Sequence, residues 1–394
     1  SLAGPLANLA AAPVVAVLQP TLFLALLAAP APAAARFVAA AAHPLLVALD
    51  AVARVAASLP GLVVHVAPTL ATALLLGAAA AAALVAATAS RPVRPGLAGV
   101  LVLAVAVWMP DRPMGPRGRV ELHMLDVGQG DALALRAPAG RWILFDAGPA
   151  WRTGDAGRRV VIPYLRRRGG AVAAFVLSHP HLDHVGGAPT AIDALRPAEY
   201  WDAGFAAGGE RYRASLDAAT TGRVAWRRAR PGDSTVVDGV TVRFLAPDSA
   251  WAASLADANN ASTVALVRYG AVRFLLVGDA EAPEEEWLLG HARAELAADV
   301  LKVAHHGSRT STTPAFLAAV RPRVALVSVG LGNEYGHPSA DVLARLAGAG
   351  AQVLRTDLLG TVVVRTDGRH ITVTAADQEW PVASPASPDE WPPR

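Results

Sequence analysis

Cysteine is absent from all 394 residues, so thiolate metal sites, cysteine nucleophiles and disulfide bonds are excluded. Any metal ion in this protein must therefore be held by histidine and carboxylate side chains. Charge is also scarce at the start, because residues 1–35 contain no charged side chain. The net charge is only +3, from 35 Lys and Arg against 32 Asp and Glu, which favours a polyanionic partner only weakly.

The composition changes near Pro110, where long runs of Ala, Leu and Val give way to an ordinary density of charges. A chain of this length usually exceeds one hydrophobic core, which agrees with two regions. We predict a membrane region over 1–110, a globular domain over 111–376 and a disordered, Pro-rich tail over 377–394. The apolar start at Ser1 lacks a preceding basic segment, which we interpret as a fragment rather than a signal peptide.

Three apolar stretches in the first region are candidate membrane spans. Thr69–Ser90 contains no charge and, as a helix, is long enough to cross the roughly 30 Å hydrocarbon core of a bilayer. We predict a transmembrane helix there. Gly96–Met109 is shorter and would need local thinning of the bilayer. Ala10–Ala29 is a weaker candidate because Gln19 and Pro20 lie at its centre.

Polar side chains between these stretches fall on one helical face. Arg36, His43, Asp50 and Arg54 follow one another at intervals of seven, seven and four residues, which places them on one narrow stripe. Such a helix lies in the membrane interface or turns its stripe toward a water-filled interior. A soluble Ala-rich helix with a solvated face is the alternative.

Two arginines bear on the orientation in the membrane. Arg91 and Arg94 lie in the predicted short loop between the last two candidate spans. Positive loops tend to stay in the cytoplasm, so a crossing by Gly96–Met109 would place the following domain outside it. We therefore expect a multi-pass protein of the inner (cytoplasmic) membrane whose globular domain is extracytoplasmic.

From Arg119 onward, short β-rich runs alternate with helical stretches, which predicts a layered α/β or α+β domain. The expected strands are 120–125, 132–137, 142–145, 173–177, 240–245, 263–269, 272–277, 300–303, 324–329, 351–355, 361–366 and 370–374. The expected helices are 160–168, 183–195, 281–291, 313–320 and 339–347.

A dense cluster of metal-binding side chains directly follows the expected strand 173–177. Three imidazoles and a carboxylate lie within six residues, on a predicted tight turn from strand to helix: His179, His181, Asp183 and His184. Residues so close together on one turn can face a common cation. Core packing does not readily explain such a cluster, so we predict a metal site.

Later strands end in further ligand types. Asp279 follows the apolar run Phe274–Gly278, and a carboxylate that bridges two cations reduces their mutual repulsion. We assign Asp279 as this bridge. His305 and His306 follow the expected strand 300–303, and His337 comes later. Together these residues supply enough ligands for two metal ions, but the spacing leaves open which of the three late histidines binds directly.

These residues together resemble the metallo-β-lactamase superfamily, whose signature is H-x-H-x-D-H followed by a bridging Asp and a late His. Four further motifs resemble the C-terminal domain of ComEC-type DNA-internalisation competence proteins: LDVGQGD at 125–131, NNAS at 259–262, HHGS at 305–308 and NEYGHP at 333–338. The resemblance implies an αββα sandwich carrying a two-metal phosphodiesterase, suggested in that family to degrade the DNA strand that is not imported. It also implies that the apolar first region is the end of a membrane channel region.

The chain departs from the superfamily at one ligand position. Where the superfamily usually supplies another His before the bridging Asp, this chain has Asn259 and Asn260, as the competence branch does. An amide offers only a carbonyl oxygen, which is a poorer ligand for zinc and a better one for Mg²⁺ or Mn²⁺. We therefore expect two divalent ions, Mn²⁺ or Zn²⁺, with Mg²⁺ as an alternative.

We assign roles to these residues as a hypothesis. His179 and His181 hold one metal, Asp183 and His184 hold the other, Asp279 bridges them, and a late His completes the shell. Two such cations would activate water for in-line attack on phosphorus, with Asp183, Asp279 and His306 as the catalytic set. Other polar residues are assigned as second-shell partners that support the ligands: Asp126, Asp131, Asp146, Asn259, Asn260 and Ser308.

Substrate and partners are less constrained by the sequence. We expect single-stranded DNA, the membrane and other DNA-uptake components as partners, without a prediction of oligomeric state. The basic runs 166–168 and 223–230 form either a nucleic-acid track or a solvated surface. Some aromatic residues could stack on unpaired bases or serve only in packing: Trp151, Trp201, Tyr212 and Trp226. Two alternatives stay open: a hydrolase of a small ester, lactone or cyclic phosphodiester, and a DNA transport module with a degenerate metal site.

Overall fold

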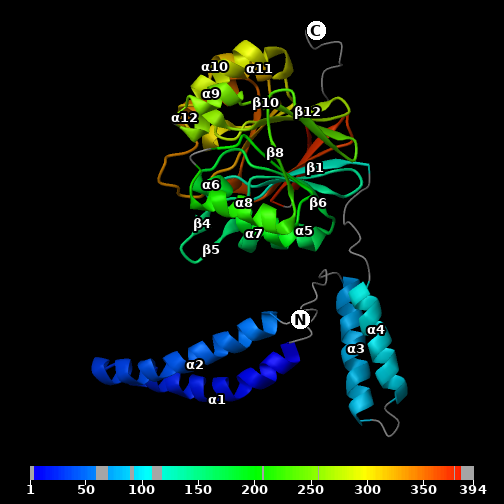
Figure 1. The fold of residues 1–394 in the computed structure, drawn as a ribbon, viewed down its shortest axis with the longest axis vertical. Helices are drawn as coiled ribbons and strands as arrows, with labels where there is room; N and C mark the ends of the chain where they lie inside the picture. Colours follow the sequence, from blue (N-terminus) through cyan, green and yellow to red (C-terminus); the bar gives the residue numbers. More distant parts are fainter. Residues whose placement is uncertain are drawn as a thin grey trace. The chain divides into compact units, whose positions relative to one another are not determined.

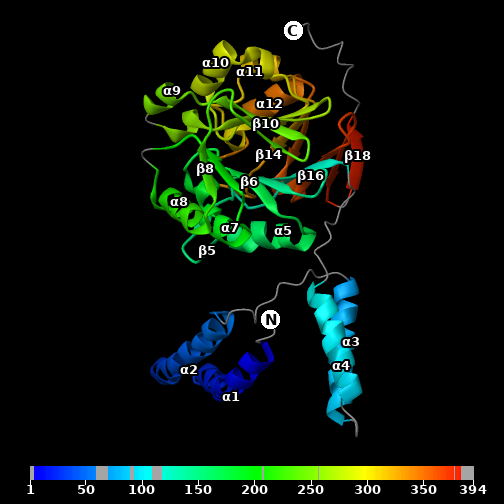
Figure 2. The same cartoon turned by 45° about the vertical axis from the view of Figure 1, so that its right-hand side comes forward.

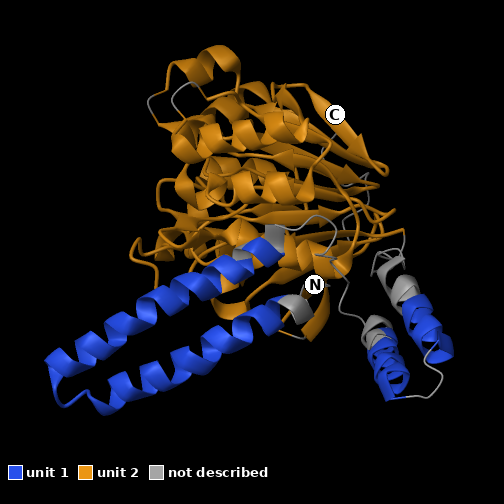
Figure 3. Ribbon diagram, turned by 60° about the horizontal axis from the view of Figure 1, so that its bottom comes forward, with its two compact units in different colours: residues 1–110 blue, residues 111–394 orange. Residues whose placement is uncertain are grey.

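The computed structural model describes residues 4–58, 70–88, 93–108, 118–205, 208–255, 257–376 and 378–382. The chain divides into two compact units, Ser1–Pro110 and Asp111–Arg394, at the point where the composition changes (Figure 3).

The first unit consists of helical hairpins. Helix α1 (Gly4–Leu27) packs along α2 (Pro32–Ser58), and α3 (Leu70–Thr88) packs along α4 (Val93–Trp108) (Figure 1). Among the described residues, Ala7–Leu27 and Pro32–Ala53 are long and apolar enough to cross a membrane, judged by length and composition alone. Gly77–Thr88 and Val93–Val102 are shorter apolar segments.

These helices revise several predictions about the first region. Gln19 and Pro20 do not interrupt the first candidate span, because α1 continues through both Pro13 and Pro20. The stretch with the polar stripe is itself a candidate span in α2. Arg94 lies inside α4 rather than in a loop. The next residue, Pro95, is tolerated there because it lies in the first helical turn, where backbone N–H groups have no partner within the helix. Thr69, the ends 89–90, Arg91 and Met109 lie outside the described residues.

The second unit is built on two large β-sheets (Figure 2). The nine-stranded sheet has the order β18 (Gln378–Val382), β17 (Ile371–Ala375), β16 (Val362–Thr366), β1 (Val120–Met124), β2 (Leu133–Arg136), β3 (Trp142–Phe145), β6 (Val172–Val176), β7 (Glu199–Asp202) and β8 (Ala225–Arg228). The seven-stranded sheet has the order β15 (Gln352–Arg355), β14 (Val324–Val327), β13 (Val300–Lys302), β12 (Val272–Leu276), β11 (Val264–Tyr269), β10 (Val240–Ala246) and β9 (Ser234–Val237). A short hairpin joins β4 (Ala150–Trp151) and β5 (Gly154–Asp155).

Both faces of each sheet are covered, which gives the expected αββα sandwich. Side chains alternate between the faces of a strand, so Phe274 points into the core between the sheets while Leu275 packs against the helices outside. Figure 1 shows the two helical layers on opposite sides of the sheets. Against the nine-stranded sheet lie α5 (Ile162–Arg168), α6 (Leu182–Val185), α7 (Ala188–Leu195) and α8 (Glu210–Gly222), and against the seven-stranded sheet α10 (Ala282–His291), α11 (Pro314–Val320) and α12 (Ala340–Gly348).

All the strands expected from the sequence are present, and no end is shifted by more than two residues. The expected helix 183–195 is split into α6 and α7 at Gly186 and Gly187. A Cβ atom at either glycine would overlap neighbouring backbone, that of Ala150 for Gly186 and that of Ala147 for Gly187. The tail prediction is wrong for Gln378–Val382, because β18 pairs with β17 and Trp380 packs against the inner core. Residues 383–394 lie outside the described residues.

Candidate metal centre

The predicted ligands come together because several strands end at one edge of the sandwich. Strands β12, β13 and β14 are parallel, so their carboxyl ends meet at the same edge of the seven-stranded sheet. Asp279 follows β12, His305 and His306 follow β13, and His337 lies in the loop after β14. The loop after β6 brings His179 and the first turn of α6 to the same place.

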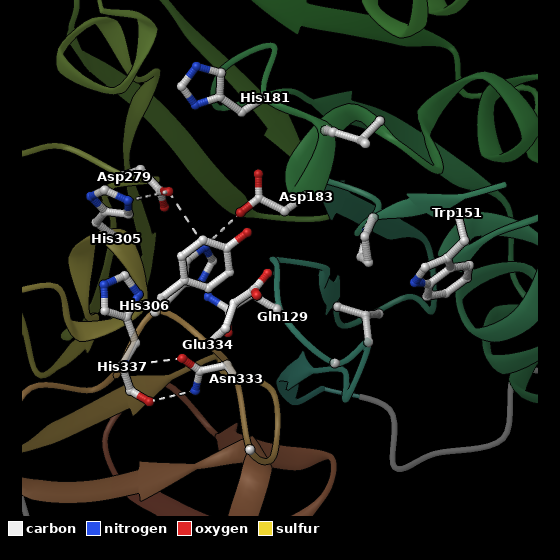
Figure 4. Close-up of a pocket in the computed structure, with 16 residues that line it drawn as sticks. Gln129, Trp151, His181, Asp183, Asp279, His305, His306, Asn333, Glu334 and His337 are labelled. Atoms are coloured by element: carbon white, nitrogen blue, oxygen red, sulfur yellow. Dashed lines mark hydrogen bonds and ion pairs between the residues drawn. The ribbon is translucent and has the colours of Figure 1, made fainter.

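Asp279 lies among these imidazoles, and Figure 4 shows it beside His305. Its carboxylate is buried, and its Oδ2 lies within 4.0 Å of the Nε2 atoms of four histidines: His184 at 3.2 Å, His306 at 3.5 Å, His305 at 3.8 Å and His179 at 4.0 Å. Asp183 Oδ2 lies 3.2 Å from His306 Nε2 and 3.6 Å from His184 Nε2. The carboxylate of Asp279 therefore lies between imidazole nitrogens from two loops, the one after β6 and the one after β13.

Each of these four imidazoles has its other ring nitrogen, Nδ1, within hydrogen-bond distance of an oxygen. His184 Nδ1 lies 2.9 Å from Asp146 Oδ2, and His306 Nδ1 lies 2.8 Å from the Ser328 carbonyl. His305 Nδ1 lies 2.9 Å from Glu281 Oε1, and His179 Nδ1 lies 3.1 Å from Ser178 Oγ. A proton on Nδ1 leaves the lone pair on Nε2, the tautomer that a metal requires.

The donor set fits divalent metal ions. Nε2 of His179 and of His184 is buried and has no hydrogen-bond partner, and buried polar atoms are rarely left in that state. Among the described residues, Asp183, His184, Asp279 and His306 offer ligand atoms that all lie within 4.8 Å of one another. Imidazole nitrogens with carboxylate oxygens suit zinc, manganese and related cations.

The backbone at the second histidine pair is held in an uncommon conformation. His305 and His306 have positive φ angles of 47° and 52°, which side chains other than glycine seldom adopt. Strained backbone of this kind occurs at functional sites when the surrounding structure enforces it. Here it directs two consecutive imidazoles toward Asp279.

Negative charge dominates the centre electrostatically. Burial alone would lower the pKa of His184 and of His306, but nearby carboxylates, Asp279 foremost, raise the pKa of both well above the ordinary value. A bound dication would be attracted by the same carboxylates and would compete with those protons.

A buried lysine, which the sequence analysis did not identify, lies beneath the histidines. Lys302 forms an ion pair with Asp131, donates to the Gly278 carbonyl at 3.0 Å and lies 3.6 Å from Asp279 Oδ1. Burial raises the pKa of Asp131, yet Lys302 and the nearby histidines outweigh it and lower that pKa to about 2. The signal in the sequence was a single charge in the apolar run 300–304, directly before the histidine pair.

His181 and His337 lie at the margin of this centre. His181 is exposed, and its ring packs edge-on against that of His179 with centroids 4.7 Å apart. The ring of His337 lies 5.5 Å from that of His305. Burial, together with the charges of His305 and His306, lowers the pKa of His337 to about 4.

The residues expected to support the ligands contact them in different ways. Asp146 holds His184 as described, and Asp131 Oδ1 lies 3.4 Å from His306 Nδ1. Asn260 reaches Glu281, the carboxylate that holds His305, with Nδ2 and Oε2 3.4 Å apart. Ser308 is linked to the same Glu281 through the Thr310 hydroxyl.

Two further residues that were expected to support the ligands have mainly local contacts. Asn259 is buried, and its backbone N–H is held by Asp257. Asp126 does not orient an imidazole as expected, because it is exposed and accepts a hydrogen bond from the Gly128 backbone. It shapes the loop that leads to Gln129.

A cavity of about 780 Å³ opens in front of the centre, within the size range of small-molecule sites. Asp183, Asp279, His305 and His306 line its floor, and Trp151 and Tyr335 also line it. The side chain of Asp183 is 34% exposed, against 2% for Asp279. Asp183 is therefore the carboxylate of the pair that a substrate can reach.

The sequence of the second unit matches known proteins. The family model of the Metallo-beta-lactamase superfamily matches residues 125–330, just over half of the 394 residues. Recombination protein 2 of Haemophilus influenzae is 35% identical over 266 residues, which cover 68% of this chain and 31% of that protein. ComE operon protein 3 of Bacillus subtilis is 32% identical and covers 63% of this chain and 33% of that protein.

A third relative carries competence in its name. Competence protein ComA of Neisseria gonorrhoeae is 32% identical over 269 residues, which cover 68% of this chain and 35% of that protein. The chain spans about a third of the length of these three relatives. The expected resemblance to competence proteins is thereby confirmed.

Proposed function

Since the chain belongs to the metallo-β-lactamase superfamily, we propose that its second unit is a metal-dependent phosphodiesterase that cleaves DNA. The observation that carries the proposal is the position of Asp279 Oδ2 within 4.0 Å of four imidazole Nε2 atoms. A carboxylate surrounded in this way is suited to bridging two cations.

The roles of His179, His184 and His306 follow from their Nε2 atoms, which face Asp279. His179 would hold one cation, and Asp183, His184 and His306 would hold the other, with Asp279 between them. His181, at the margin of the centre, is assigned to the first cation by the H-x-H motif alone. Of the late histidines, His305 supplies a further nitrogen on the side where the superfamily's usual histidine is replaced by asparagine. Glu281 holds the ring of His305 in this orientation. His337 would contact substrate at the rim.

When bound, the two cations would supply Lewis acidity for activating water and for stabilising charge on phosphoryl oxygens. The protein's contribution is to keep the ligands fixed. Asp146 and the Ser328 carbonyl each hold one imidazole in its metal-binding tautomer. Lys302 offsets part of the negative charge, so that the buried carboxylates stay ionised next to one another.

We also propose that this activity serves DNA uptake at a membrane. The support is the similarity to a competence protein and the two apolar helices of the first unit. In this proposal the strand that is not imported is the substrate, and the first unit keeps the enzyme at the membrane.

The test is cleavage of a labelled single-stranded DNA by the full chain in detergent, with Mn²⁺, Mg²⁺ or Zn²⁺ added in turn. We expect metal-dependent cleavage that Asp183→Ala and Asp279→Ala abolish. Asp193→Ala, which removes an exposed carboxylate elsewhere, serves as the control and should cleave normally. No cleavage above the two ligand variants with any metal would refute the nuclease.

The size of the cavity favours a second candidate, the hydrolysis of a small ester, lactone or cyclic phosphodiester. The same assays with such compounds separate the two. Turnover of a small substrate without cleavage of DNA would assign the centre to small-molecule hydrolysis. A transport module with a degenerate site is less favoured, because the H-x-H-x-D-H residues and Asp279 are all present.

A further inference from the structure

Two large aromatic side chains stand exposed at the mouth of the metal cavity. Trp151 is 41% exposed and Tyr335 is 64% exposed, and both line the cavity that holds Asp183 and Asp279. Among the described Trp, Tyr and Phe side chains of the second unit, the exposed ones are these two and Trp226, which does not line the cavity. Aromatic side chains that line a cavity together with a few polar groups are typical of binding sites.

Trp151 is fixed relative to the metal ligands. It belongs to the β4–β5 hairpin, where it pairs with Gly154. The chain leading into this hairpin is hydrogen-bonded to the ligand loop, from the Ala147 N–H to the His184 carbonyl at 2.9 Å. The guanidinium of Arg159 lies 5.1 Å from the ring centroid, which adds positive charge beside the indole.

Tyr335 is presented by a loop that is tied together by one side chain. Asn333 Nδ2 donates to the His337 carbonyl at 2.7 Å, and Asn333 Oδ1 accepts from the His337 N–H at 3.0 Å. The Tyr335 ring stacks on that of His337, with centroids 5.8 Å apart and an angle of 27° between the planes. Figure 4 shows His337 across the cavity from Trp151. The metal centre thus has an aromatic platform on two sides.

We propose that Trp151 and Tyr335 form a stacking subsite for unpaired nucleobases, so that the substrate is a single nucleic-acid strand. This inference rests on the proposed phosphodiesterase and specifies its substrate. A strand bound in this way would place a phosphate over the cations and neighbouring bases on the two rings. Bases in a duplex are covered by their neighbours on both faces, whereas unpaired bases offer a free face to an aromatic side chain. Arg159 would add attraction for the phosphate backbone.

The experiment measures binding and cleavage by the full chain in detergent. Fluorescence anisotropy gives the Kd for a labelled single-stranded oligonucleotide and for an abasic strand of the same length, and Mn²⁺-dependent cleavage gives kcat and KM. The variants are Trp151→Ala and Tyr335→Ala, with Trp151→Phe and Tyr335→Phe as conservative replacements. Trp226→Ala is the matched control, since Trp226 is similarly exposed, at 46%.

Each alanine variant is expected to raise the Kd and KM for the single strand about tenfold, the usual scale for one stacked base, with kcat changed less than about twofold. The phenylalanine variants should recover most of the affinity. For the abasic strand, neither alanine variant should differ from the unmodified chain, because there is no base to stack.

Two results would overturn the subsite: unchanged Kd for the single strand in both alanine variants, or equal losses for the normal and abasic strands. The two measurements test the two proposals separately. If the chain cleaves no strand but Trp151→Ala weakens single-strand binding, the phosphodiesterase is wrong and the subsite stands. If cleavage is metal-dependent and the alanine variants bind normally, only the subsite is wrong.

Discussion

Single residues determine which atoms remain free to bind a metal. The sequence indicated the ligands, because H-x-H-x-D-H places three imidazoles and a carboxylate on one turn. It could not indicate how each ring is held, since Glu281 and Ser328 reach the histidines only through the tertiary fold. The approach of Lys302 to Asp279 also depends on that fold. Asp126 shows the converse case: a carboxylate at a promising strand end that serves only a local turn.

Asp146 is expected to control metal affinity through His184. Asp146→Asn removes a carboxylate oxygen that His184 Nδ1 and the Ser178 hydroxyl both contact. The ring would lose its fixed tautomer, so metal affinity should fall roughly 10- to 100-fold, as at other sites with such partners. Competition with a fluorescent chelator measures the change. Asp193→Asn is the control, and equal affinity in both variants would contradict this role.

Lys302 is expected to be needed mainly for its charge. Lys302→Met removes the lysine that pairs with buried Asp131, which should cost about 3–5 kcal/mol in the free energy of unfolding. The double variant Lys302→Met with Asp131→Asn should recover much of this loss, because the uncompensated charge is gone. Urea unfolding of both variants measures the difference. A double variant as unstable as the single one would argue that Lys302 acts through packing instead.

At the scale of elements, the first turns of α10 connect the loops of the site. Glu284 accepts a hydrogen bond from the Ser262 backbone, and the Ser262 hydroxyl accepts one from the Asp279 N–H. Glu285 accepts bonds from the backbone of Thr312 and Thr313. A helix N-terminus favours carboxylates, which offsets part of the cost of burying them. The sequence predicted this helix, but not that its acidic face points inward.

Glu284 predicts a pH dependence of stability. Burial raises its pKa in the folded state well above the ordinary value of 4.5. The ordinary pKa applies to the unfolded chain, so at a pH between the two values only the folded chain keeps the proton on Glu284. The contribution of this proton to stability is present at low pH and is lost as pH rises. Glu284→Gln should therefore lose less stability than the unmodified chain as pH rises above 4.5, the ordinary pKa of this group.

Urea unfolding across this pH range checks the prediction for Glu284. Glu286→Gln, on the exposed side of the same helix, is the control and should follow the unmodified chain. Parallel pH profiles for Glu284→Gln and the unmodified chain would show that Glu284 is ionised at little cost in the folded protein.

The secondary structure was predictable where apolar periodicity was strong. The inner strands β12, β13 and β14 appear as apolar runs in the sequence, and all three were expected. Strands β7 and β8 were missed, because charged residues interrupt the apolar pattern of each, as in Glu199–Asp202 and Ala225–Arg228. The break between α6 and α7 was also missed, since it depends on close backbone contacts at Gly186 and Gly187.

At the scale of the whole molecule, the two units differ in the solvent they are suited to. The second unit buries its apolar side chains in three core clusters, whereas α1 and α2 leave most of theirs exposed. Exposed apolar helices of this length are suited to lipid. Composition alone predicted this division, but not which helices would be long enough to cross a membrane.

Membrane attachment gives a test at this scale. The full chain expressed in bacteria is expected to remain with the membrane fraction after extraction at alkaline pH and high salt, because attachment through apolar helices resists both treatments. Fractionation followed by immunoblotting measures this. Complete release by high salt alone would show that the attachment is electrostatic and that α1 and α2 do not insert.

Whether Asp279 bridges two metal ions can be measured by electron paramagnetic resonance of the full chain titrated with Mn²⁺. A bridging carboxylate predicts about two bound ions per chain with the multiline spectrum of an exchange-coupled pair, as expected for ions a few ångströms apart. Asp279→Ala should abolish the coupling. A spectrum of isolated Mn²⁺ at saturation, or one that Asp279→Ala leaves unchanged, would show that Asp279 does not bridge two ions.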